Sequence, residues 1–271
     1  MKLNDKVAII TGASSGIGKS LAHELAKRGC NLVLAARQYV TLCEMAQSIE
    51  KEYPVKAVAI QCDVTVEADC ELLIKQALIT YGKIDILVNN AGISMRALLK
   101  DAEINVLKKV MDVNFWGTVY CTKYALPEIL KTNGSIVGVS SIAGTKGLPG
   151  RTGYSASKFA MNGFLDSLRV ENLKTGIHVL TACPGFTASN IRNNSLTADG
   201  MQQGESTLEE DKMMTSDEAA AIIAQGIENR DRTLTMTGQG KLLVFLNKFV
   251  PGLVDKMVYN TIAREKNSLL K

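Results

Sequence analysis

The 271-residue sequence lacks the features that mark several large classes of protein. No apolar run reaches about 18 residues, the length that a membrane-spanning helix needs. Residues 1–6 carry no apolar stretch of the kind found in signal peptides, so we expect no leader or membrane anchor before the first strand. The 6 cysteines form no Cys-x-x-Cys pair, and there are only 2 histidines. This pattern predicts no metal site and reduced, mostly buried thiols, as in a cytoplasmic protein.

A strong charge excess is also missing. Lysine and arginine number 31 against 27 aspartates and glutamates, which gives a net charge of +4. Nucleic-acid-binding proteins usually carry a larger and more clustered basic excess, so we expect no nucleic-acid partner. Hydrophobic residues make up 46% of the chain and charged residues 21%, the composition of a globular protein rather than of a disordered chain.

Short apolar runs alternate with amphipathic stretches along most of the chain. The runs, typical of strands buried on both faces, are Val7–Thr11, Asn31–Ala36, Ala57–Gln61, Ile84–Asn89, Ser135–Val139 and His178–Ala182. The predicted helices between them include Val40–Glu52, Glu67–Tyr81, Ile104–Leu130 and Tyr154–Thr175. This alternation predicts an α/β fold, a doubly wound parallel sheet with helices on both faces. We expect a single domain with a core over residues 1–185, a substrate loop over 186–215 and a C-terminal strand and helical tail over 216–271.

Three glycines, Gly12, Gly16 and Gly18, follow the first strand and open a helix. Gly12 permits a tight turn, Gly16 lets the backbone approach a pyrophosphate, and Gly18 lets the helix pack closely on the strand. The positive N-terminus of that helix then faces the phosphates. Although a glycine triplet alone is a weak signal, its position after the first strand of a repeated βα pattern favours a dinucleotide site.

The second strand ends without the carboxylate that would bind the ribose 2′-hydroxyl of NAD(H). Ala36 occupies that position and Arg37 follows it. A guanidinium there can bind a 2′-phosphate through two hydrogen bonds, although it can also be an ordinary solvated arginine. The sequence therefore favours NADP(H) over NAD(H).

Tyr154 and Lys158 lie four residues apart, on one face of a predicted helix. An ammonium beside a phenol stabilises the phenolate and lowers its pKa, although such a pair by itself is common on helix surfaces. The context is more specific. Thr11–Gly18, Asp63, the Asn89–Gly92 run, Asn114, Ser141, Tyr154 with Lys158 and the Pro184–Gly185 pair occur in the order of the short-chain dehydrogenase/reductase family, classical subtype. From about Lys6 to Ser189 the chain resembles that family, which implies a Rossmann fold and an NAD(P)-dependent oxidoreductase.

The resemblance implies roles for four catalytic residues. Tyr154 matches the general acid that protonates the carbonyl oxygen, and Ser141 the serine that hydrogen-bonds the same oxygen. Lys158 matches the lysine that lowers the tyrosine pKa and binds the nicotinamide ribose. Asn114 matches the asparagine that bends a helix and holds a water in the proton relay.

The resemblance also implies a cofactor site. Asp63 matches the aspartate that contacts the adenine amino group, and Ser14 with Arg37 are candidates for the 2′-phosphate. Ser189 stands where the family often has threonine, and we expect its hydroxyl to be used. The full set is Gly12, Ser14, Ser15, Gly16, Ile17, Gly18, Arg37, Asp63, Val64, Asn90, Ala91, Gly92, Tyr154, Lys158, Pro184, Gly185, Thr187 and Ser189.

Substrate specificity is expected from Ile93–Leu99, Ile142–Thr152 and Thr187–Thr215. Their side chains include Met95, Leu98, Leu148, Phe186, Ile191 and Leu196, and the methionines Met161, Met213 and Met214 are further candidates for an apolar pocket. Apolar lining favours an apolar or lipid-like ketone. Within the family, residues 190–200 and 251–266 resemble the dehydrogenase/reductase member 7B type and, more distantly, 11-beta-hydroxysteroid dehydrogenases and 3-ketosphinganine reductases.

The amphipathic tail over Lys241–Lys266 has two interpretations. Its apolar faces can cover the substrate pocket or a partner subunit, which we favour, or they can contact a membrane surface. The resemblance implies that the long helices Ile104–Leu130 and Tyr154–Thr175 join subunits, so we expect a homodimer or homotetramer. We therefore expect an NADPH-dependent reductase that turns a ketone into a secondary alcohol. The alternatives are an NAD-dependent alcohol dehydrogenase and a non-catalytic, cofactor-sensing protein of the same fold.

Overall fold

The computed structural model describes residues 1–187, 191–192, 194–204, 213–264 and 267–270. Within these residues the centre is a seven-stranded sheet of order β3-β2-β1-β4-β5-β6-β7, in which each neighbouring pair is parallel. The strands are β1 (Val7–Thr11), β2 (Asn31–Ala36), β3 (Ala57–Gln61), β4 (Ile86–Asn89), β5 (Ser135–Val139), β6 (His178–Cys183) and β7 (Thr233–Thr235). The predicted doubly wound parallel sheet is confirmed.

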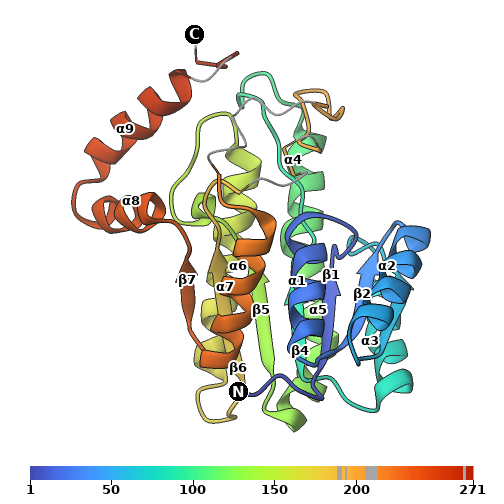
Figure 1. Cartoon of the computed structure of the whole chain (residues 1–271). Helices are drawn as coiled ribbons and strands as arrows, with labels where there is room; N and C mark the ends of the chain where they lie inside the picture. Colours follow the sequence, from blue (N-terminus) through green and yellow to red (C-terminus); the bar gives the residue numbers. More distant parts are fainter. Residues whose placement is uncertain (188–190, 193, 205–212, 265–266, 271) are drawn as a thin grey trace.

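Helices cover both faces of this sheet (Figure 1). They are α1 (Gly16–Lys27), α2 (Tyr39–Glu52), α3 (Glu67–Tyr81), α4 (Ile104–Met111), α5 (Gly117–Thr132), α6 (Thr152–Glu171), α7 (Ser216–Asn229), α8 (Gly238–Phe249) and α9 (Pro251–Ala263). A π-helical turn, Asp112–Trp116, joins α4 to α5, and a short 3₁₀ turn, Ile142–Gly144, follows β5. None of the helices in the described part of the chain is long and apolar enough to cross a membrane.

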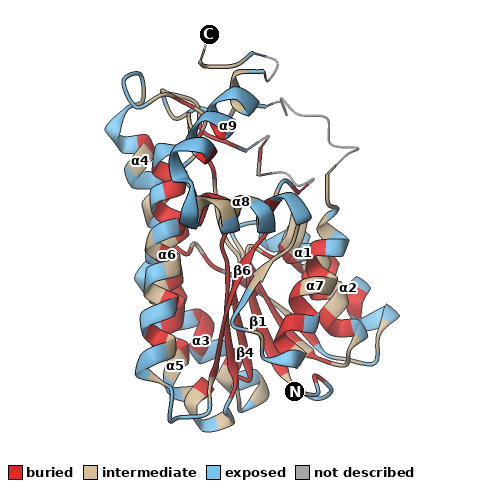
Figure 2. Cartoon of the chain, turned by 90° about the vertical axis from the view of Figure 1, so that its left-hand side faces the viewer, coloured by how far each residue is buried: buried red, intermediate tan, exposed pale blue. Residues whose placement is uncertain are grey.

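The sheet separates two apolar cores, and Figure 2 shows its buried strands between exposed outer helix faces. Successive side chains of a strand point to opposite faces, so neighbouring residues of β1 enter different cores. Ala8 and Ile10 pack with α1, α2 and α7, whereas Val7 and Ile9 pack with α3, α5 and α6. Because the central strands are buried on both faces, they read in the sequence as continuous apolar runs.

Several predicted boundaries differ from the structure. The strand predicted from Ile84 begins at Ile86, and the helix predicted over Tyr154–Thr175 spans Thr152–Glu171. The single helix predicted over Ile104–Leu130 is wrong, because the π-helical turn divides it into α4 and α5. A π-turn inserts one residue without interrupting the apolar pattern, so helical periodicity does not reveal it.

Helix α7 was not predicted, although the sequence carries a signal for it. Thr215 caps its N-terminus by accepting a hydrogen bond from the Glu218 backbone, and the Glu218 side chain accepts from the Thr215 backbone in return. This reciprocal arrangement is the capping box, which begins helices. The buried side of α7, including Ile223 and Ile227, completes the core over α1 and the sheet.

The close packing of α1 on the end of β1 depends on Gly18. A Cβ at this position would lie 2.4 Å from both the Gly12 carbonyl oxygen and Asn90 Nδ2. We predict that Gly18→Ala lowers the free energy of unfolding by about 1–3 kcal/mol, because the backbone oxygen has no room to move. Gly163→Ala is the control, since nothing lies within 4 Å of its added Cβ in the middle of α6. It should raise stability by about 0.5–1 kcal/mol. Urea unfolding of both variants measures the difference, and equal effects would contradict the packing argument.

Candidate active site

The site lies at the carboxyl ends of the strands, where β1 and β4 are neighbours. The chain leaves these two strands in opposite directions across the sheet, which opens a crevice in which doubly wound folds bind ligands. A cavity of about 1860 Å³ occupies this position. It extends from the glycine loop to helices α8 and α9, so it has room for a dinucleotide and a second molecule.

The glycine loop forms a turn with an uncapped helix end. Gly12 has φ +64° and Gly16 has φ +53°, both in the left-handed region that glycine adopts at little cost. Ser15 precedes α1 without capping it by a side-chain hydrogen bond, and the first turn holds no acidic residue. The N–H groups of this turn, together with the helix dipole, therefore suit an anion such as a pyrophosphate.

A hydrogen-bond network joins the loop to the end of β4. Thr11 Oγ1 accepts from the backbone N–H groups of Asn90 (3.0 Å) and Ala91 (3.1 Å). Asn90 Nδ2 donates to the carbonyl oxygens of Thr11 (2.9 Å) and Gly12 (3.2 Å). These bonds set the width of the crevice between the glycine loop and the Asn89–Gly92 run.

Most of the predicted cofactor residues line this one cavity. They are Gly12, Ser14, Ser15, Gly16, Ile17, Arg37, Asp63, Val64, Asn90, Ala91, Gly92, Tyr154, Lys158, Pro184, Gly185 and Thr187. Gly18 lies behind the loop, where it contacts Gly12 and Asn90. Ser189 falls outside the described residues. Ala36 ends β2, so no carboxylate stands at that position, and the exposed Arg37 follows it at the rim of the cavity.

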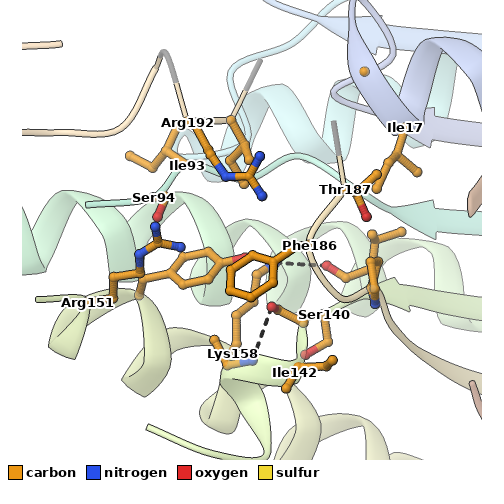
Figure 3. Close-up of a pocket in the computed structure, with 18 of the residues that line it drawn as sticks. Ile17, Ile93, Ser94, Ser140, Ile142, Arg151, Lys158, Phe186, Thr187 and Arg192 are labelled. Carbon is orange, nitrogen blue, oxygen red and sulfur yellow. Dashed lines mark hydrogen bonds between the residues drawn. The ribbon is translucent and has the colours of Figure 1, made fainter. Parts of the chain in front are cut away.

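Tyr154, Ser141 and Lys158 meet on the floor of the cavity. Tyr154 and Lys158 come from α6, and Ser141 precedes the 3₁₀ turn after β5. Lys158 Nζ donates to the Val139 carbonyl oxygen at 2.8 Å and lies 5.8 Å from the centre of the Tyr154 ring (Figure 3). Ser141 hydrogen-bonds the Tyr154 hydroxyl, so two hydroxyl groups converge on one point. This is the arrangement needed to hold and protonate a carbonyl oxygen.

The titration of these groups reflects their burial. Burial raises the pKa of Tyr154, and the Ser141 hydrogen bond, Arg151 and Arg192 oppose that rise. Burial also lowers the pKa of Lys158 from 10.5 to about 8. The Lys158 ammonium donates to the Val139 carbonyl oxygen and is not among the groups that shift the pKa of Tyr154. The lowering of the tyrosine pKa by Lys158 therefore stays a prediction.

Asn114 lies in the π-helical turn, at the bend implied by the resemblance. Its side chain accepts from Ile93 N (2.8 Å) and donates to Ile93 O (2.9 Å) and Ser157 Oγ (2.9 Å). A Cβ at Gly92 would lie 3.2 Å from Asn114 Oδ1 and 3.6 Å from Lys158 Nζ, so this glycine leaves space between the two side chains. The role of Asn114 in a water relay stays a prediction.

The three predicted specificity segments all contribute to the cavity, but not through every predicted side chain. Leu148, Phe186, Ile191, Leu196, Met213 and Met214 line it. Met95 does not, because it is fully buried in a satellite core with Ala97, Val106 and Val110. Leu98 is absent from the lining, and Met161 belongs to the main core. Irregular loops have no regular pattern of inward and outward side chains. The sequence therefore did not distinguish residues that line the cavity from residues buried in the core.

Residues that sequence reasoning missed come from two places. Arg151 and Arg192 line the substrate side of the cavity, and Thr237 with the start of α8 lies beside Gly185. A Cβ on Gly185 would lie 2.6 Å from Thr237 Oγ1. Arg151 precedes the tyrosine motif by three residues, which was an available but unspecific signal.

The C-terminal helices cover the cavity, as the favoured interpretation of the tail expected. Leu243, Leu246, Met257, Val258 and Ile262 line it. Other apolar side chains of these helices face away from the protein, among them Phe245, Phe249 and Leu253, which are 59%, 69% and 54% exposed. Figure 2 shows this largely exposed side of α8 and α9.

Neither histidine belongs to the site, as expected. His178 is buried between Ser135 Oγ (3.0 Å) and the Asp231 carbonyl oxygen (2.7 Å). His23 lies on α1, 3.7 Å from Glu52. Cys183 is buried at the end of β6, and burial raises the pKa of its thiol to about 11, so it is not a reactive thiolate.

Comparison with known proteins shows which family this chain resembles. The short chain dehydrogenase family matches residues 6–200. The dehydrogenase/reductase SDR family protein 7-like of Drosophila melanogaster is 36% identical over 259 residues, 93% of this chain and 79% of that protein. Member 7B of Mus musculus is 32% identical over 276 residues, 98% and 84% of the two chains. The 11-beta-hydroxysteroid dehydrogenase-like 4A of Arabidopsis thaliana is 40% identical over 199 residues, 73% and 66%. The resemblance stated from the motifs is confirmed.

Two solved structures share the fold. A short chain dehydrogenase/reductase of Burkholderia phymatum in complex with NAD superposes with a TM-score of 0.83 at 23% identity, covering 93% of this chain and 96% of that one. An alcohol dehydrogenase of Thermococcus sibiricus complexed with 5-hydroxy-NADP superposes with a TM-score of 0.77 at 24% identity, covering 86% and 96%. The predicted Rossmann fold is thus confirmed.

Burying the Lys158 ammonium costs stability, and this cost depends on pH. The folded pKa of about 8 lies below the ordinary 10.5, so the unfolded chain holds the proton more tightly. The penalty is complete below pH 8 and is relieved as the pH rises toward 10.5. We predict that Lys158→Met raises the free energy of unfolding by about 1–3 kcal/mol at pH 7 and by less at pH 9.5.

Urea unfolding at the two pH values measures this effect. Lys100→Met is the matched control, because Lys100 is exposed on the surface. It should show no gain at pH 7. A Lys158→Met protein that is less stable than the parent at pH 7 would show that the hydrogen bond to Val139 outweighs the cost of burial.

Proposed function

Because the chain belongs to the short-chain dehydrogenase family and is therefore an oxidoreductase, we propose that it is an NADPH-dependent reductase of an apolar, lipid-like ketone. The product is a secondary alcohol. The observation that carries the proposal is the convergence of Tyr154 and Ser141 over a buried Lys158, in the same cavity as the glycine loop.

The cavity fits a nicotinamide dinucleotide. The left-handed Gly12 and Gly16 and the uncapped start of α1 would hold the pyrophosphate, and Asp63 the adenine. Arg37 would pair with a 2′-phosphate, which supports NADP(H) over NAD(H). Pro184, Gly185 and Thr187 also line the cavity, and they match the positions where the family holds the carboxamide.

When bound, the reduced nicotinamide supplies a hydride to the carbonyl carbon. The carbonyl π electron pair then moves to the oxygen, and the Tyr154 hydroxyl gives that oxygen its proton. Ser141 donates a hydrogen bond to the same oxygen while charge develops on it. Lys158 stabilises the tyrosinate left behind, and solvent returns the proton to it through the Asn114 region.

Other features support the remaining expectations. The apolar lining by Leu148, Ile191, Leu196 and the C-terminal helices suits a ketone with a sizeable apolar part. The 6 cysteines are all unpaired, which agrees with a reducing, cytoplasmic compartment. Exposed apolar side chains between Ile104 and Phe159, among them Ile104, Trp116 and Phe159, support a homodimer or homotetramer. Sedimentation velocity would measure the mass of that oligomer.

The central test is NADPH oxidation by the purified protein and by Tyr154→Phe on a ketone panel. The panel contains 3-ketosphinganine, an acyl-dihydroxyacetone phosphate, 3-oxoacyl thioesters, steroid ketones and small aromatic ketones. We expect kcat to fall by roughly 10²–10⁴-fold in Tyr154→Phe, because the proton donor is lost, while NADPH binding is kept. Full activity in Tyr154→Phe would overturn the mechanism. NADPH binding without turnover of any ketone would favour the cofactor-sensing alternative.

Removing the Arg37 side chain tests the cofactor preference. We predict that Arg37→Ala raises KM for NADPH by roughly 10–100-fold, since a charge-assisted pair with the 2′-phosphate is lost. The KM for NADH, which lacks that phosphate, should change less than about 3-fold. Steady-state kinetics with both cofactors gives the comparison. A parent enzyme that prefers NADH, with no response to Arg37→Ala, would support the NAD-dependent dehydrogenase instead.

A further inference from the structure

We infer that Arg151 binds an acidic group on the substrate, so that the ketone reduced here carries a carboxylate or phosphate as well as an apolar part. The inference rests on the proposed reductase function and names the class of ketone.

The substrate side of the cavity is lined by charges of one sign. Lys109, Arg151, Arg192 and Arg264 all line the cavity, and Asp63 is the single acidic residue among its described lining residues. Asp63 follows β3, which is four strands away from β5 in the sheet. At about 4.8 Å per strand this separation is about 19 Å, so Asp63 does not neutralise the cationic side. A cleft with one sign of charge attracts ligands of the opposite sign.

Arg192 is already engaged in the wall of the cavity. It is 7% exposed, its guanidinium lies 5.7 Å from the centre of the Phe186 ring, and Nη1 is 2.8 Å from Met213 Sδ. These contacts join the Arg192 guanidinium to Phe186, which follows β6, and to Met213, which precedes α7. Arg192 therefore contributes a fixed positive charge and shapes the wall of the site.

Arg151 is placed differently. It is half-buried, and no carboxylate in the described part of the chain forms an ion pair with it. Its backbone is held on both sides, because Arg151 N donates to Leu148 O (3.1 Å) and Ser155 N donates to Arg151 O (2.8 Å). Gly150, at φ +71°, turns the chain so that its carbonyl oxygen accepts from Ala97 N (2.9 Å). The backbone from which the Arg151 side chain extends is therefore fixed.

The position of Arg151 relates it directly to the reacting carbonyl. Arg151 is the N-cap of α6 and stands three residues before Tyr154, about 4.5 Å along the helix axis. Its charge acts on the Tyr154 hydroxyl and opposes the rise in the pKa of that group that burial causes. In Figure 3, Arg151 lies with Ser94 on the side of the cavity away from Ile17 and Thr187. It is therefore on the substrate side of the catalytic tyrosine.

A guanidinium in this place recognises an oxyanion. It offers planar paired donors that match carboxylate or phosphate oxygens, and half-burial strengthens such a pair relative to one in water. The ketone carbonyl would lie at Tyr154 and Ser141, its acidic group at Arg151, and its apolar part against Leu148, Leu196 and the C-terminal helices. The hydride and proton transfers are those of the proposed reaction, and the acidic group is unchanged by them.

The experiment compares matched substrate pairs in three variants. 2-Oxooctanoate is paired with its methyl ester, and dihydroxyacetone phosphate with dihydroxyacetone, so that each pair differs in charge. The variants are Arg151→Gln, Arg151→Lys and the control Arg232→Gln, whose side chain is 72% exposed and does not line the cavity. The readout is the ratio of kcat/KM between parent and variant for each substrate, which cancels the intrinsic reactivity of the ketone.

We expect Arg151→Gln to lower kcat/KM for the anionic member of one pair by roughly 10–100-fold and for its neutral partner by less than about 3-fold. Arg151→Lys should recover part of the loss, and Arg232→Gln should change neither substrate. The responsive pair distinguishes a carboxylate from a phosphate. Equal losses for charged and neutral members, or an unchanged Arg151→Gln, would overturn the inference while leaving the reductase function standing.

If no ketone is reduced, calorimetry on the NADP⁺ complex tests the binding of an acidic group by Arg151, which is called the anchor below. Octanoate and octyl phosphate are the charged probes, and 1-octanol is the neutral one. Binding of a charged probe that is at least 10-fold weaker in Arg151→Gln than in the parent supports the anchor. Equal affinity in the two proteins, or no binding of either charged probe, overturns it.

Discussion

The site depends on the hydrogen bonds that join the end of β1 to the end of β4. Thr11 Oγ1 accepts two backbone N–H groups from the segment after β4, and Asn90 Nδ2 donates back to Thr11 and Gly12. These two strands lie where the chain changes direction across the sheet, so the segments that follow them run in opposite directions and leave a crevice between them. The network keeps the crevice at one width, which sets the distance between the phosphate loop and the floor of the site.

On that floor the protein accepts a cost in stability to hold a positive charge. Lys158 is 2% exposed, and its ammonium is satisfied by the carbonyl oxygen of Val139 at the end of β5. A buried ammonium is costly, and the lowered pKa of this lysine is the measure of that cost. Gly92 contributes by leaving space between Lys158 and Asn114. The wide cavity and the apolar C-terminal helices then decide what reaches the tyrosine.

Much of the fold and of the cofactor site was predictable because local residue types carry it. Strands buried on both faces must be apolar throughout, and the glycines of the phosphate loop are required by backbone conformation and close contact, as at Gly12 and Gly18. Helical periodicity did not reveal the break at the π-helical turn, although the resemblance implied a bend at Asn114, whose side chain hydrogen-bonds the distant Ile93. Met95 looked like a pocket residue by type and proved to be core, because burial is decided by neighbours from other segments.

By itself the sequence determined the alternation of strands and helices, the phosphate loop and the spacing of the tyrosine and lysine, since each is a local pattern with a local physical cause. Only the tertiary structure decided what those residues face. It brought Ser141 to Tyr154 from another element, folded α8 and α9 over the cavity, and left Arg151 on the substrate side without a described carboxylate partner. Contacts between segments far apart in the chain depend on packing and on the course of the backbone, which residue type and spacing do not contain.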